Sequence, residues 1–198
     1  YGHVLTQFVD NPDLTVEEVV LLSPAQQAAI LNQGCGPERS FPVDVPITDQ
    51  IREQAKRTPD RIAVVDGTLR LDYAHIDAVS DRLAQRLAVL GARRGTFVPL
   101  VMASSAAQLI AEIAVMKTGA AFVPVDPDWP AARRQAIMAR LAPPVAIVHE
   151  EPSRGELAPV CQVIAVDAAG NPEGPAEPSG DGPMALTPVG GEDTIYCI

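Results

Sequence analysis

The sequence predicts an α/β fold, a parallel, doubly wound sheet flanked by helices, preceded by a helical and extended linker. Three observations lead to this fold class. From Phe97 onward, short continuous apolar runs alternate with helix-length segments, and such runs are typical of parallel strands buried on both faces. The connections between these segments are short, as in repeated strand–helix–strand units. The chain has 198 residues, 47% of them hydrophobic, which is enough for a buried core.

Residues 1–45 are predicted to be short helices joined by loops. Ser23 and Pro24 mark a helix start, because Ser is a favoured N-cap and Pro is favoured at the first helical position. The stretch from Gly34 to Pro46 is rich in Gly and Pro, which is the composition of a linker.

The next elements are a helix, two short strands and a second helix. The first helix starts near Ile47 and has about ten residues, with apolar side chains spaced by four positions. Ile62–Asp66 and Arg70–Asp72 are predicted strands, and Asp72 can cap the helix that follows. The predicted buried stripe of that helix consists of Ile76, Val79, Leu83, Leu87 and Leu90.

The pattern then becomes that of a parallel sheet. Phe97–Met102 is a predicted buried strand. Ser104 or Ser105 should cap a helix from Ala106 to Lys117, which is apolar on nearly all faces and therefore deeply buried. The further strands are predicted at Ala121–Val125, Val145–Val148 and Val163–Val166, with a helix opened by Asp128 and Pro130 between the first two.

Residues 168–193 are predicted to be a flexible loop. They contain six Gly and five Pro and show no apolar period. Thr194–Ile198 becomes apolar and rich in strand formers, so a further strand is expected there.

Composition excludes several classes of function. The formal net charge is −10, and nine of the 25 acidic residues lie in residues 150–198, where Arg154 is the single base. A nucleic-acid-binding surface is therefore not expected. The most apolar stretch, Leu109–Val125, is interrupted by Glu112 and Lys117, so no membrane-spanning segment is expected either.

The cysteines and histidines do not form a recognisable catalytic or metal-binding set. Their positions are Cys35, Cys161, Cys197, His3, His75 and His149. The three widely spaced cysteines argue against a disulfide framework or a zinc site and favour a reducing, cytoplasmic compartment. Cys161 and Cys197 lie in apolar strands and are expected to be core residues, and His149 is expected to be a lone surface histidine.

Asp126 and Asp128 form the one pair of carboxylates that could suggest acid/base chemistry. We favour a structural role, in which Asp126 ends a strand and Asp128 caps the next helix.

Two segments resemble core motifs of adenylate-forming enzymes. Residues 71–76 resemble the first motif, Leu-Thr-Tyr-x-Glu-Leu, and Met116–Pro130 resembles the second, Leu-Lys-Ala-Gly-x-Ala-Tyr-Val-Pro-Ile-Asp-Pro-x-Tyr-Pro. Arg57-Thr58-Pro59-Asp60 resembles the entry segment of the same family. His75 stands where the first motif has Glu, so the reciprocal hydrogen bond of a capping box is expected to be lost.

The resemblance implies a fragment of a nonribosomal peptide synthetase. Val16–Gln27 looks like the tail of a condensation domain, which implies a condensation-domain tail and linker at 1–45 and the N-terminal part of an adenylation domain at 46–198. The complete enzyme would use ATP and Mg to convert an amino acid to an aminoacyl adenylate and would load it on a phosphopantetheine carrier. The expected partners are the condensation domain, the remaining adenylation segment and the carrier domain, or a partner chain.

The resemblance assigns no catalytic, cofactor-binding or metal-binding residue to 1–198. The family's phosphate loop, ribose-binding aspartate and catalytic lysine match no position of this sequence, so we expect the isolated chain to be inactive. Because residue 1 is Tyr, we expect the chain to be a piece of a larger synthetase. The alternative is a natural truncation, a non-catalytic remnant that acts as a docking or spacer platform.

Overall fold

The computed structural model describes the chain except residues 38–39, 41–43, 150–154, 156, 175–192 and 198. The chain divides into two compact units, Tyr1–Pro42 and Val43–Ile198. Among the described residues, no helix is long and apolar enough to cross a membrane.

The first unit consists of short helices, as predicted. They are α1 (Gly2–Asp10), a 3-10 turn (Val16–Glu18) and α2 (Pro24–Gly34). The Ser23 hydroxyl accepts a hydrogen bond from the amide of Gln26, and the Gln26 side chain accepts one from the amide of Ser23. This reciprocal cap, with Pro24 in the first turn, confirms the predicted helix start. No described residue of this unit is buried.

The second unit opens with a helix, a hairpin and a long helix. These elements are α3 (Ile47–Arg57), β1 (Ile62–Asp66), β2 (Leu69–Asp72) and α4 (Tyr73–Val89). The strands β1 and β2 pair antiparallel. The Asp72 carboxylate accepts a hydrogen bond of 2.7 Å from the amide of His75, so Asp72 caps α4 as predicted. The predicted stripe of α4 is buried, with Leu90 only partly buried.

A four-stranded parallel sheet forms the core of this unit. Its strands are β3 (Phe97–Val101), β4 (Ala121–Val125), β5 (Val145–Val148) and β6 (Gln162–Ala165), in the spatial order β4-β3-β5-β6. Each lies within one residue of its predicted bounds.

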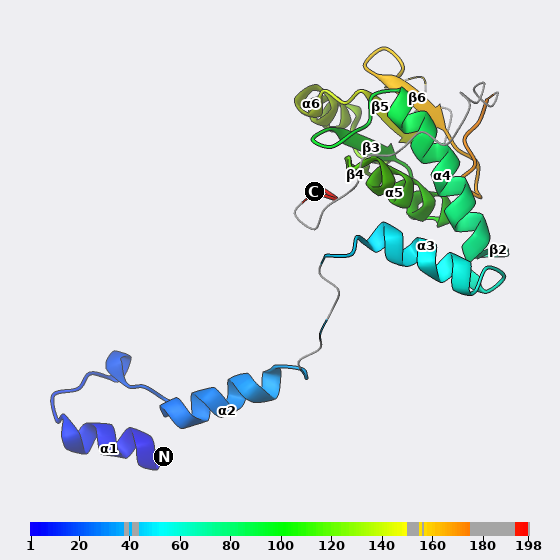
Figure 1. The fold of residues 1–198 in the computed structure, drawn as a ribbon. Coiled ribbons are helices and arrows are strands. Elements are labelled where there is room, and N and C mark those ends of the chain that lie inside the picture. The colour runs from blue at the N-terminus through cyan, green and yellow to red at the C-terminus, as the bar shows by residue number, and fades with distance from the viewer. Residues whose placement is uncertain (38–39, 41–43, 150–154, 156, 175–192, 198) are drawn as a thin grey trace. The chain divides into compact units, whose positions relative to one another are not determined.

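Helices cover both faces of the sheet (Figure 1). Successive side chains of a strand point to opposite faces, so Val98 and Leu100 pack with α4 and α5 (Ala106–Thr118), while Val101 packs with α6 (Ala131–Leu141) through Met138. The predicted doubly wound arrangement is therefore confirmed.

One predicted helix cap is wrong. Helix α6 begins at Ala131, so its N-cap position falls on Pro130, which has no side chain able to accept a hydrogen bond. Asp128 lies too far upstream to cap this helix. Its amide instead donates a hydrogen bond of 2.9 Å to the carboxylate of Asp126, which closes a turn between β4 and α6.

The segment after β6 is partly described. Residues 166–174 hold a hydrogen-bonded turn, in which Val166 and Pro172 form an antiparallel bridge. Residues 175–192 lie outside the described residues, so the flexibility expected for 168–193 stays a prediction. The strand expected at 194–198 is described as far as Cys197, and it forms a single parallel bridge between Tyr196 and Phe122 of β4.

Candidate functional site

The carboxyl edge of the parallel sheet is the candidate site. In doubly wound sheets, ligands bind outside the carboxyl ends of the strands, where the strand order reverses. Here the chain passes from β3 to β4 on one side and returns to β5 on the other side of β3, so the reversal lies between β3 and β5. Ser105 follows β3, Asp126 follows β4 and His149 follows β5, so the fold brings these three side chains, none of which was predicted to be catalytic, to the same edge of the sheet.

The N-terminus of α5 at this edge already has hydrogen-bond acceptors from the protein. The Ser105 hydroxyl accepts from the amide of Gln108 at 3.3 Å, and the Asp66 carboxylate accepts from the amide of Ala106 at 2.9 Å. A helix N-terminus binds anions through such free amides. Because a carboxylate occupies this one, it is not arranged to hold a phosphate group. The sequence pattern gave no sign of the contribution of Asp66, which comes from the β1–β2 hairpin.

The sequence did not decide whether Ser104 or Ser105 caps α5, and the structure shows that Ser105 is the cap. We expect Ser105→Ala to lower the free energy of unfolding by about 1 kcal/mol, the usual cost of losing an N-cap. Ser104→Ala is the matched control, because Ser104 is exposed and precedes the cap position. Urea unfolding of both variants measures the difference, and equal stabilities would show that the Ser105 cap contributes little.

The Asp126 turn has a structural role. Asp126 and Asp128 are both exposed, and Asp126 is engaged within the turn. Arg134 of α6 donates hydrogen bonds to the backbone carbonyls of Pro127 and Trp129. The Arg133 guanidinium lies 4.0 Å from the centre of the Trp129 ring, a cation–π contact. These contacts fix the entry to α6 and agree with a structural role for the two carboxylates, although Asp128 is not the cap.

Two histidines hold the turn that follows β6. The His149 Nδ1 atom lies 2.9 Å from the carbonyl oxygen of Val166, and His75 Nε2 lies 3.2 Å from that of Ala169. The ring nitrogen must donate in both cases, because a carbonyl oxygen can only accept. His75 thus replaces the lost capping contact with a long-range one. The third histidine, His3, lies in α1 of the other unit.

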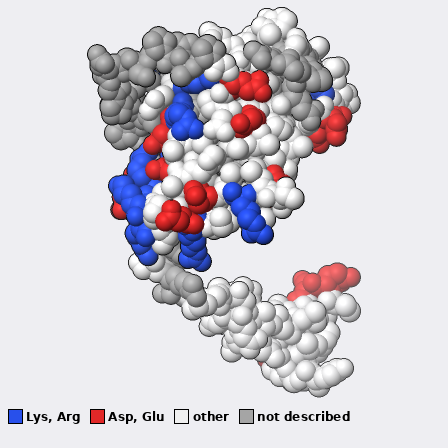
Figure 2. Space-filling model, turned by 90° about the vertical axis from the view of Figure 1, so that its right-hand side faces the viewer, with Lys and Arg blue, Asp and Glu red and all other residues white. Residues whose placement is uncertain are grey.

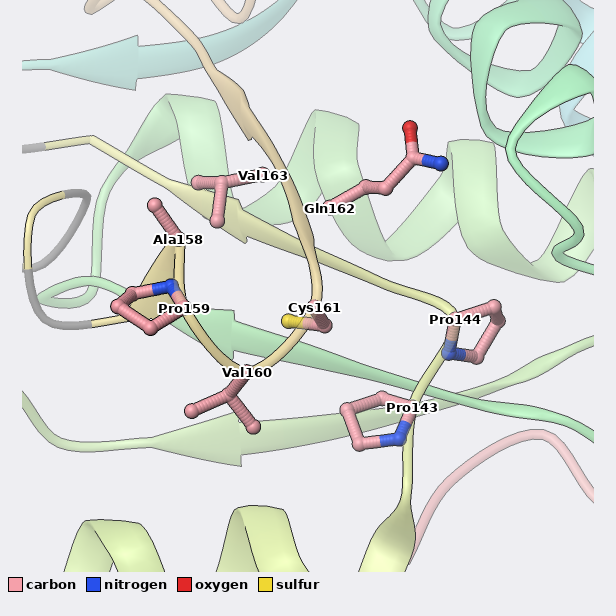
Figure 3. Close-up of a pocket in the computed structure, with 8 residues that line it drawn as sticks. All are labelled: Pro143, Pro144, Ala158, Pro159, Val160, Cys161, Gln162 and Val163. Carbon is pink, nitrogen blue, oxygen red and sulfur yellow. The ribbon is translucent and has the colours of Figure 1, made fainter.

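The cysteines give no sign of a nucleophile. Cys161 and Cys197 pack against the cluster between the sheet and α6 but are only partly buried and lie outside the strands, so they are not the core strand residues that the sequence predicted. Burial raises the pKa of the Cys161 thiol, so it stays protonated at neutral pH and is a poor nucleophile. Figure 3 shows Cys161 in an open hollow lined by Pro143, Pro144, Val160 and neighbouring residues. This hollow lies beside the segments that lead into β5 and β6, at the edge opposite the candidate site.

The charged cluster around Lys117 was not predicted. The Lys117 side chain is 1% exposed, and its Nζ atom lies 2.7 Å from a carboxylate oxygen of Asp77 and 2.7 Å from one of Asp81. The Ser80 hydroxyl accepts a third hydrogen bond at 2.9 Å. Arg52 of α3 pairs with the same carboxylate of Asp81 at 3.1 Å. The cluster joins α3, α4 and α5 and contributes no group to the carboxyl edge.

No group of three or more His, Cys, Asp or Glu side chains within the described part of the chain could hold a metal ion. On the face drawn in Figure 2, basic and acidic side chains are interspersed. At the carboxyl edge, the side chains of Ser105, Asp126 and His149 are hydrogen-bonded within the protein.

Comparison with known proteins identifies the family. The family model described as AMP-binding enzyme matches residues 51–198. Malpibaldin synthetase of Mortierella alpina is 32% identical over 135 residues, which cover 68% of this chain and 2% of that protein. The nonribosomal peptide synthetase otaB of Aspergillus carbonarius (strain ITEM 5010) is 30% identical over 200 residues, which cover 99% of this chain and 10% of that protein.

A solved structure agrees with these relatives. The nonribosomal peptide synthetase FmoA3 (S1046A), in its α-methyl-L-serine-AMP-bound form, superposes with a TM-score of 0.68 at 27% identity, covering 85% of this chain and 18% of that one. The chain thus spans a small fraction of the proteins that it matches. It belongs to the AMP-binding enzyme family, and residues 51–198 are the N-terminal portion of an adenylation domain of the kind found in nonribosomal peptide synthetases.

Proposed function

We propose that the complete protein activates an amino acid for nonribosomal peptide synthesis. A carboxylate oxygen of the amino acid attacks the α-phosphorus of ATP, pyrophosphate leaves, and an aminoacyl adenylate forms. The phosphopantetheine thiol of a carrier domain then attacks the acyl carbon, loses its proton and releases AMP. Within this protein, residues 1–45 are the condensation-domain tail and linker, and residues 46–198 are the N-terminal part of the adenylation domain.

The observation that carries this proposal is the fold of the second motif, Met116–Pro130. The motif forms the end of α5, the strand β4 and the turn into α6, so its turn lies at the carboxyl edge of the sheet, the edge at which ligands bind in such sheets. A motif placed at the ligand-binding edge supports an adenylating function more strongly than the fold class alone.

The segment beside β4 supports the same function. Phe122 donates a backbone hydrogen bond of 3.0 Å to Ile195, and Cys197 donates one of 3.1 Å to Phe122. Because this pairing is parallel, the segment runs toward the same carboxyl edge as β4. In the family that the sequence resembles, the phosphate loop follows such a strand, so we propose that this edge receives the loop.

The cofactors and partners belong to the complete synthetase. ATP and Mg would be held by residues outside the described part, and phosphopantetheine would be carried by a carrier domain. The partners would be the condensation domain and the rest of the adenylation domain. We propose a cytoplasmic location, which agrees with the three unpaired cysteines.

Amino-acid-dependent exchange of labelled pyrophosphate into ATP tests the proposal. The assay uses the full synthetase that contains this chain, with a panel of proteinogenic and modified amino acids and a reaction without amino acid as the control. We expect at least one amino acid to stimulate exchange at least tenfold over this control. A folded protein that shows no exchange with any amino acid would contradict the proposal and favour a non-catalytic docking or spacer platform.

A further inference from the structure

Helix α3 is attached to the second unit by a few buried side chains and by charge. It is the first helix of that unit, and it follows the segment that comes from the first unit. Its apolar contribution is small, because its buried side chains are the small residues Thr48 and Ala55, while Ile51 is only partly buried and Ile47 is 49% exposed. The charged link from α3 to α4 is Arg52, which lies 3.1 Å from Asp81 and 3.9 Å from Asp77.

The other half of this charge cluster is buried in the core. Lys117 of α5 is 1% exposed and binds the same two carboxylates at 2.7 Å each. Asp77 and Asp81 therefore keep a buried cationic partner whether or not Arg52 is present. The Arg52 side chain is 34% exposed, so water and salt can compete for its contacts. Its ion pairs can open while those of Lys117 stay closed.

The chain is attached to the core again directly after α3. The amide of Ala74 donates to the carbonyl oxygen of Pro59, and the amide of Tyr73 donates to that of Arg61, at 3.1 Å each. These backbone bonds join the segment to the start of α4. Release of α3 would therefore stop at this second attachment, without disturbing the hairpin or α4.

We propose that α3 is a releasable latch, which means a helix that can detach from the second unit and thereby lengthen the segment that connects the two units. When the Arg52 ion pairs open, α3 leaves the surface of α4 while α4, α5 and the sheet stay packed. An isolated helix of this length is marginally stable in water, so the released segment unwinds. Its eleven residues span about 16 Å as a helix and up to about 37 Å when extended. The release thus lengthens the segment that connects the first unit to α4. On the proposed function, this segment joins the condensation-domain tail to the adenylation domain.

Hydrogen–deuterium exchange of the full protein tests the latch. In Arg52→Gln, we expect peptides of α3 to exchange about three to ten times faster than in the unmodified protein, with peptides of Tyr73–Val89 and Ala106–Thr118 unchanged. Lys56→Gln is the matched control, because it removes a charge from the same helix and loses only an exposed pair with Glu53. The α3 exchange of this control should stay within twofold of the unmodified protein.

Salt provides a second measurement without any substitution. Raising NaCl from 50 mM to 1 M should accelerate exchange of α3 about threefold in the unmodified protein and much less in Arg52→Gln. Equal protection of α3 in the Arg52 and Lys56 variants would overturn the latch. So would equal acceleration of α3 and α4, because the two helices would then open as one cooperative unit.

Discussion

Replacing Gly170 with alanine is expected to lower the free energy of unfolding by about 2–4 kcal/mol. Gly170 has a φ of +78°, a left-handed conformation that costs a residue with a Cβ about 1–2 kcal/mol. A Cβ at this position would also lie 2.8 Å from the side chain of Ile110, which is fully buried in α5 and cannot move aside cheaply. Thermal and urea unfolding of the variant measure the loss.

Gly174 provides the matched control. Its φ is +95°, so alanine pays a similar backbone cost, but the nearest atom to its Cβ is the flexible end of Arg86 at 3.6 Å. We expect Gly174→Ala to cost about 1–2 kcal/mol. If both variants lost the same stability, the contact between Gly170 and Ile110 would be unimportant and only the backbone term would remain.

The Gly170 turn has contacts that composition could not predict. Six Gly and five Pro in 168–193 predict a flexible loop, because local sequence gives no apolar period there. The contacts made by 168–174 come in part from residues far away in the sequence. The Asp167 carboxylate accepts hydrogen bonds from the amides of Ala169 and Asn171, Arg82 of α4 donates to the Asn171 side chain, and His75 contacts the carbonyl oxygen of Ala169. The contacts from α4 join residues about 90 positions apart and leave no periodic signal.

The sheet could be predicted because its signals are local. Each strand is a continuous apolar run bounded by turn or cap residues, and Ser105 and Gly119 mark the two ends of α5. The carboxyl edge also follows from the order of strands and helices along the chain. The hydrogen-bond acceptors at that edge could not be predicted in the same way, because Asp66 reaches the start of α5 from a separate hairpin. The prediction that Asp128 caps α6 was wrong for a local reason, since the helix begins after Pro130 rather than near Asp128.

The burial of Lys117 in the core also could not be predicted from local sequence. By periodicity it is the last residue of a helix that is apolar on nearly all faces, where a lysine is expected to reach solvent. It is instead buried, because Asp77 and Asp81 lie four positions apart on the facing side of α4 and present two carboxylates to it. The sequence motif contains Lys117, but its partners lie 36 and 40 positions away.

Lys117→Met is therefore expected to lower the free energy of unfolding by about 2–4 kcal/mol. Methionine nearly preserves the volume, so the loss is electrostatic: two carboxylates are left facing each other without their shared ammonium group. Their partial exposure, 21% for Asp77 and 37% for Asp81, and the nearby Arg52 keep the loss below that of a fully buried pair. Lys56→Met is the control, and it should leave stability nearly unchanged because its ion pair with Glu53 is exposed.

The effect of Asp77→Asn on stability should change sign when Lys117 is replaced. This change of sign distinguishes the electrostatic explanation from a simple loss of packing. In the unmodified protein, Asp77→Asn should destabilise, because it removes a carboxylate that Lys117 binds at 2.7 Å. In the Lys117→Met background the same substitution should stabilise, because it removes one of two carboxylates that no longer share a buried cation. A double-mutant cycle followed by urea unfolding measures both steps. If Asp77→Asn destabilised both backgrounds equally, Lys117 would act through its packing, and the charge cluster would not be what joins α5 to α4.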